Sequence, residues 1–119
     1  MIRGIGIDLV DIERFKKILE RTPAMKERIF TAREIRPTMA SLAARFAAKE
    51  ALYKALSSSE GKRTALSWHE AEVIKSESGK PSFFFSGEIA RLIDGAQVHL
   101  SLSHDGSLAS AFVLIEDRD

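Results

Sequence analysis

The chain has 119 residues, a net charge of +1 and 45% apolar residues, which indicate a single soluble domain over residues 1–119 with a modest core. It contains no cysteine, which excludes disulfides, thiol catalysis and thiolate metal sites. The near-neutral charge disfavours nucleic-acid binding, and the absence of a signal segment or long apolar run predicts a cytoplasmic protein without a membrane span.

The first segment predicts a β-strand with two unlike faces. Within residues 4–10, isoleucine and leucine alternate with glycine and with Asp8, which is a period of two residues. The glycines leave room for close approach by another backbone or a ligand. The rest of the segment is typical of a buried strand, where an unpaired carboxylate is costly, so Asp8 requires a partner.

The following segments predict an α+β fold with a mostly antiparallel sheet, one long helix and several shorter helices. Asp11 caps a helix to about residue 20. Residues 31–34 match a capping box, and Pro37 limits the helix that it starts. The aromatic run over residues 83–85 indicates a strand buried on both sides, in part by another subunit. Other predicted segments are an alanine-rich helix over 38–56, a polar mobile loop over 57–63, strands over 68–75, 82–85, 98–103 and 108–115, and a short helix over 86–93.

The long helix carries a second acid, Glu50, among basic residues. If the fold brings Asp8 and Glu50 together, they repel each other unless a cation lies between them. Mg²⁺ commonly binds one or two carboxylates together with substrate phosphates. Arg45, Lys49 and Lys54 would then face the negative charge of that substrate. The simpler alternative is a surface ion pair between Glu50 and Lys54, worth roughly 0.3 kcal/mol.

Two further groups of polar residues have open interpretations. Ser103, His104 and Asp105 have the residue types of a hydrolase triad, but adjacent residues on a strand point in opposite directions. Phosphate binding by Ser103 or His104 is the better interpretation. A third group, made up of Arg14, Lys17 and Arg21, is either a solvated helix face or a docking surface for an acidic partner.

Several motifs together resemble the holo-acyl-carrier-protein synthases, which are small 4′-phosphopantetheinyl transferases. The resemblance begins with residues 4–10 and continues with the signature helix over residues 45–56. Residues 79–81 and 99–104 match two more family motifs in the same order, and Phe30, Thr31 and Glu34 fit a weaker one. The resemblance implies the fold of that family and transfer of 4′-phosphopantetheine from coenzyme A to a serine of apo-acyl carrier protein. It also implies a role in fatty acid biosynthesis and a homotrimer with coenzyme A between protomers.

The resemblance also implies roles for individual residues. The metal-ligand positions of the family fall on Asp8 and Glu50, which would hold Mg²⁺ at the pyrophosphate of coenzyme A. Glu50, or a water on the metal, would deprotonate the carrier serine, and Lys54 would stabilise the leaving group. Glu34 is a second candidate base, although capping is its simpler role. The predicted binding residues for the 3′-phosphate and adenine end are Arg45, Lys80, Pro81, Ser103 and His104, from more than one chain, and those for the acidic carrier helix are Arg14, Lys17 and Arg21.

The chain departs from many relatives in two places. A serine-rich segment over residues 57–61 replaces a glycine-rich loop, and the stretch between Thr31 and Arg45 is shorter. Two other classes of protein remain as alternatives. A non-catalytic adaptor for acidic helices would need only the basic first helix, and a small nucleic-acid binder is disfavoured by the charge.

Overall fold

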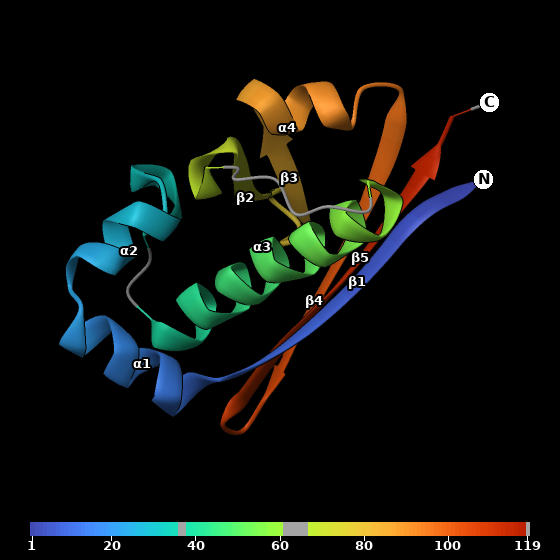
Figure 1. Ribbon diagram of the computed structural model, residues 1–119. Coiled ribbons are helices and arrows are strands. Elements are labelled where there is room, and N and C mark those ends of the chain that lie inside the picture. The colour runs from blue at the N-terminus through green and yellow to red at the C-terminus, as the bar shows by residue number, and fades with distance from the viewer. Residues whose placement is uncertain (36–37, 61–66, 119) are drawn as a thin grey trace.

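The computed structural model describes residues 1–35, 38–60 and 67–118 of the chain (Figure 1). The predicted α+β class is confirmed. The helices are α1 (Ile12–Arg21), α2 (Ala24–Ile29), the 3₁₀ helix η1 (Ala32–Glu34), α3 (Met39–Glu60), the 3₁₀ helix η2 (Trp68–Glu70) and α4 (Gly87–Leu92). The strands are β1 (Ile2–Asp11), β2 (Ala71–Lys75), β3 (Pro81–Phe85), β4 (Ala96–Asp105) and β5 (Leu108–Asp117).

The strands form two sheets, and all their pairings are antiparallel. The sequence predicted a mostly antiparallel sheet. The larger sheet has the order β1-β5-β4, and β2 pairs with β3 in the smaller one. In the larger sheet Asp8 lies opposite Ala111, and Ser103 lies opposite Ser110. Among the described residues, no helix combines the length and the apolar character needed to cross a membrane.

Helix α3 lies diagonally across one face of the larger sheet (Figure 1). Its small side chains allow this close packing, because the alanines that face the interior are fully or nearly fully buried, at positions 43, 44, 47, 48, 51 and 55. The closest approach is at Gly6, where an added Cβ atom would lie 1.8 Å from the carbonyl oxygen of Ala51. The expectation that the β1 glycines admit another backbone is therefore confirmed at Gly6.

The opposite face of the larger sheet is exposed and apolar. Ile5, Ile7 and Leu9 are 51–64% exposed, and Phe112 on the neighbouring strand is 39% exposed. The interpretation of β1 as a buried strand is therefore wrong for a single chain. On the inner side, the backbone of α3 lies so close to β1 at Gly6 that no side chain fits there. The large apolar side chains of β1 therefore lie on the outer side.

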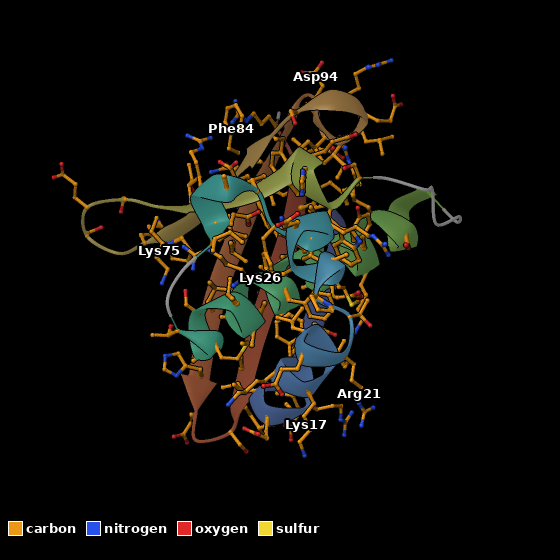
Figure 2. All side chains as sticks on the ribbon, turned by 90° about the vertical axis from the view of Figure 1, so that its left-hand side faces the viewer. Lys17, Arg21, Lys26, Lys75, Phe84 and Asp94 are labelled. Atoms are coloured by element: carbon orange, nitrogen blue, oxygen red, sulfur yellow. The ribbon has the colours of Figure 1, made fainter. Side chains whose placement is uncertain are left out.

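Strand β3 also differs from its prediction. Phe83 and Phe85 are half-buried and their rings stack at 5.2 Å, but Phe84 is 53% exposed on the other face. Figure 2 shows Phe84 at the upper surface of the molecule, where the guanidinium of Arg33 lies 5.8 Å from its ring centre. A strand of three phenylalanines is thus buried on one side only within the chain.

Element boundaries differ most from prediction in three places. Helix α3 runs to Glu60, so Ser57–Glu60 is helical rather than part of a loop, while residues 61–63 lie outside the described part of the chain. Serine costs well under 1 kcal/mol relative to alanine inside a helix, so a run of serines alone does not end one. The segments at Ala32–Glu34 and Trp68–Glu70 are single 3₁₀ turns, not the start of a helix and of a strand.

Candidate active site

Asp8 and Glu50 come from different elements and line one cavity of about 250 Å³. The pleat of β1 turns Asp8 toward the helix side of the sheet, with its side chain 16% exposed, and α3 presents Glu50. The apolar wall of this acidic cavity includes Phe15 of α1 and Phe46 of α3, whose rings stack at 4.9 Å. The structure therefore brings together the two carboxylates that the sequence singles out.

Lys54 joins the same site from the next turn of α3. Its Nζ atom donates to Oδ1 of Asp8 at 3.0 Å and to the carbonyl oxygen of Ile7 at 3.0 Å. Its side chain is 54% exposed, and it lines a small cavity together with Glu50, Tyr53 and Ser57. Lys54 is thus a cation beside the two carboxylates that is exposed enough to reach a substrate in solvent.

The donor set suits a metal ion that is shared with a substrate. No group of three or more acidic, histidine or cysteine side chains that could hold a metal occurs within residues 1–35, 38–60 and 67–118. Two carboxylate side chains on one cavity are nevertheless what Mg²⁺ uses when phosphates and water complete its coordination. Asp8 and Glu50 therefore fit Mg²⁺ as ligands in company with a phosphate, and not as a closed protein site.

A second cavity, of about 500 Å³, lies between the start of α3, the β2–β3 turn and the end of β4. It is lined by three of the predicted binding residues, Pro81, Ser103 and His104. Its other lining residues are Thr38, Ala40, Ser41, Ala44, Lys75, Gly79 and Leu102. We call it the His104 cavity. Sequence reasoning missed Lys75, although a lysine at the end of a strand beside a Gly-Lys-Pro turn was a usable signal.

Two predicted binding residues do not line the His104 cavity. Lys80 is exposed next to it, and its backbone N–H donates to Ser76 Oγ at 3.3 Å. Arg45 is only 2% exposed, and its Nη1 atom donates to the Oγ atom of Ser41, which is a lining residue. The structure also keeps the His104 cavity separate from the acidic cavity, so one chain does not unite the two predicted groups of residues.

Lys49 was expected to face substrate charge with its basic neighbours, and that expectation is wrong. Its side chain is fully buried, and its Nζ atom donates to Glu34 Oε1 at 2.8 Å and to the carbonyl oxygens of Trp68 at 2.9 Å and Ala71 at 2.8 Å. Burial lowers the pKa of the Lys49 ammonium below its usual value, although the adjacent Glu34 carboxylate acts to raise it.

Glu34 is equally remote from solvent. Its Oε1 atom accepts the backbone N–H of Thr31 at 3.0 Å, and its Oε2 atom accepts the N–H of Val73 at 2.9 Å. The capping interaction expected of Glu34 is therefore present. A fully buried carboxylate with these partners has no access to a carrier serine, so the candidate base at Glu34 is not supported.

The basic residues of α1 lie on the surface next to the acidic cavity. Arg14 is exposed and lines that cavity. Lys17 and Arg21 extend into solvent from α1 at the lower edge of Figure 2. This arrangement connects a positively charged surface directly with the two carboxylates.

Comparison with known proteins places this geometry in a family. The family model described as the 4′-phosphopantetheinyl transferase superfamily matches residues 4–113, and the chain belongs to that superfamily. A holo-[acyl-carrier-protein] synthase of Leifsonia xyli subsp. xyli is 49% identical over 119 residues, which cover 98% of each chain. The sequence-based resemblance to these synthases is thereby confirmed.

Solved structures agree in fold and carry a relevant ligand. The structure described as the Chronobacterium ammoniagenes ACPS-CoA complex has a TM-score of 0.86 and 32% identity, covering 98% of each chain. The Helicobacter pylori holo-[acyl-carrier-protein] synthase in complex with coenzyme A has a TM-score of 0.81 and 34% identity, covering 94% of this chain and 99% of that one.

Proposed function

We propose that the protein transfers 4′-phosphopantetheine from coenzyme A to a serine of an apo-acyl carrier protein, releasing adenosine 3′,5′-bisphosphate. The convergence of Asp8, Glu50 and Lys54 at one site, in a chain similar from end to end to holo-acyl-carrier-protein synthases, carries this assignment. The proposed location of the protein is the cytoplasm, where it would serve fatty acid biosynthesis.

The proposed mechanism gives a task to each of the three side chains. Asp8 and Glu50 would hold Mg²⁺, which when bound offsets the negative charge of the pyrophosphate. Glu50 accepts the hydroxyl proton as the serine oxygen forms its bond to the β-phosphorus. The bond from that phosphorus to the bridging oxygen breaks, and the half-exposed Lys54 donates to the oxygens of the departing bisphosphate. The carrier serine thus attacks coenzyme A directly, and no covalent enzyme intermediate forms.

The His104 cavity is the proposed site for the adenosine 3′-phosphate end of coenzyme A. His104 and Lys75 supply polar and cationic groups at its rim, and Pro81 offers an apolar surface for the adenine ring. Because this cavity and the acidic cavity are separate within one chain, a single coenzyme A is proposed to span two protomers.

Mass measurement of a carrier tests the function directly. The protein is mixed with coenzyme A, Mg²⁺ and an apo-carrier, and the carrier is weighed before and after incubation. We expect a mass gain of one phosphopantetheine arm, lost when coenzyme A is left out or when the acceptor serine of the carrier is replaced by alanine. No gain with several carriers would overturn the assignment.

A homotrimer is the proposed assembly, and the exposed outer face of the larger sheet is its proposed contact surface. Ile5, Ile7 and Leu9 form with Phe112 a continuous apolar surface, because the register places Ile7 opposite Phe112. A surface of this kind is a common feature of subunit contacts. A second copy of the same chain is proposed to cover this surface, and it would also supply the second cavity for coenzyme A.

Replacing Ile7 by lysine should therefore shift the protein to smaller species, since a charge would be buried without a partner in the contact. Sedimentation velocity at micromolar concentration measures the change. The matched control is Ile74→Lys, which places the same side chain on β2, at a position that is 38% exposed in the chain. Unchanged sedimentation of Ile7→Lys would contradict the proposed contact surface.

Carrier docking is proposed to use Arg14, Lys17 and Arg21. We expect the double variant Arg14→Glu/Arg21→Glu to weaken binding of an acidic apo-carrier at least about tenfold at low salt, with the difference shrinking as salt rises, because exposed charges are screened. The double variant Arg91→Glu/Arg118→Glu makes the same change in net charge on exposed residues near α4 and the C-terminal end. Equal affinity of both variants at low salt would refute docking at α1.

A further inference from the structure

Lys49 is the residue next to Glu50 in sequence, and the proposed reaction gives it no task. It is charged, fully buried and linked to residues far from it along the chain, which is an expensive arrangement for a side chain without a role. We propose that Lys49 is a positioning residue that fixes the rotation of α3 about its axis and thereby aims Glu50 and Lys54 at Asp8. This inference rests on the proposed transferase function.

The hydrogen bonds of Lys49 exclude direct contact with a substrate. An ammonium group has three protons to donate. The three acceptors within 2.9 Å, which are Glu34 Oε1 and the carbonyl oxygens of Trp68 and Ala71, match that number. Since the side chain is also 0% exposed, no proton of Lys49 remains for a phosphate.

The partners of Lys49 form a rigid support on one side of α3. Glu34 belongs to η1, Trp68 to η2, and Ala71 is the first residue of β2. Glu34 is itself held by the backbone N–H groups of Thr31 and Val73, so its carboxylate cannot follow Lys49 if α3 turns. The ammonium thus connects α3 to three separate elements at a single point.

Helical geometry shows how this contact controls the active site. Successive residues are separated by about 100° around an α-helix, so Ala51 lies about 200° from Lys49, on the opposite side. Ala51 is the residue whose carbonyl oxygen faces Gly6 of β1. Glu50 and Lys54 lie about 100° and 140° from Lys49 on the same scale, between the two contacts. With α3 held on both sides, these two residues face Asp8 in a fixed direction.

Three variants separate positioning from binding and from bulk stability. Lys49→Met and Glu34→Gln each break the pair, and the double variant Glu34→Gln/Lys49→Met removes both buried charges while keeping an amide oxygen for a backbone N–H. The matched control is Lys26→Met on α2. Folding is followed by the fluorescence of Trp68, the single tryptophan of the chain, and kinetics are measured only under conditions where each variant is folded.

For Lys49→Met and for the double variant we expect kcat to fall at least tenfold, while KM for coenzyme A changes less than threefold. The loss in the double variant should not exceed the larger of the two single losses, because both single variants disable the same support. Lys26→Met should keep both constants. If Lys49→Met does not fold, the kcat of the double variant tests the inference. If the double variant does not fold either, the kcat of Glu34→Gln tests it, and the same loss of at least tenfold is expected.

Two results would overturn the inference. A folded Lys49 variant with wild-type kcat would mean that the pair serves stability only. A variant that keeps kcat but raises KM for coenzyme A tenfold or more would make Lys49 a substrate ligand. A wild-type protein that modifies no carrier defeats the transferase assignment itself, before any variant is compared, so the two failures are distinguishable.

Discussion

Replacing Asp8 by alanine is expected to lower the rate of carrier modification by about a thousandfold or more. The substitution removes one of the carboxylates that line the acidic cavity and leaves the ammonium of Lys54 without its carboxylate partner at 3.0 Å. Charge stabilisation of a phosphoryl transition state by a bound metal is worth several kcal/mol, and each 1.36 kcal/mol corresponds to a factor of ten. Initial rates of holo-carrier formation at saturating coenzyme A measure the loss.

Asp11→Asn is a matched control for this substitution. Asp11 lies three residues further along the chain, lines the same cavity and caps α1 by accepting the N–H of Arg14 at 2.9 Å. Asparagine keeps the cap but removes the charge, so near wild-type rates are expected. A non-catalytic adaptor would instead keep its affinity for the carrier in Asp8→Ala and show no turnover in either protein. Equal rates for Asp8→Ala and wild type would end the proposed role of Asp8.

Gly6→Ala is expected to destabilise the fold by about 3 kcal/mol and to reduce turnover as well. The new Cβ atom would lie 1.8 Å from the carbonyl oxygen of Ala51, far inside contact distance, so β1 and α3 must move apart. Overpacking of this kind typically costs about 1–3 kcal/mol, and a backbone atom has less freedom to yield than a side chain. The same movement separates Asp8 from Glu50 and Lys54. Urea denaturation followed by fluorescence measures the first effect, and carrier modification the second.

The double variant Gly6→Ala/Ala51→Gly shows which atoms collide. The clash is with the main chain of residue 51, so removing the Ala51 side chain should restore nothing and should add the cost of about 1 kcal/mol for glycine inside a helix. Recovery of stability in the double variant would show that the contact depends on the Ala51 side chain instead.

The sequence predicted those parts of the fold and site that depend on local patterns. Alternation in β1 placed Asp8 and Ile7 on opposite faces, and the alanine content of residues 38–56 predicted the helix on which Glu50 lies. The sequence required a partner for Asp8 but left its convergence with Glu50 as a condition, which the structure meets at one cavity. The domain extent, residues 1–119, and the catalytic roles of the individual residues stay predictions.

What the sequence could not predict depends on contacts between distant segments. Apolar and small residues surround most of α3, so no clear stripe distinguishes the buried Lys49 from the half-exposed Lys54. The acidic partner of Lys49 is Glu34, which lies 15 residues earlier. The same limitation explains why β1 was predicted as a buried strand although Ile5, Ile7 and Leu9 are exposed, because the position of the α3 backbone, and not hydropathy, decides which side of the strand can accept large side chains.

The junction between β1 and α1 leaves this part of the chain no slack. Asp11 is the last residue of the strand and also the cap of the helix, with no linker between them. An insertion or deletion of one residue between Asp8 and Asp11 could not be absorbed there, and it would exchange the directions of Ile7 and Asp8, since alternate residues of a strand point to opposite faces. A one-codon change in length within this segment should therefore abolish subunit contact and chemistry together, although single substitutions can separate the two.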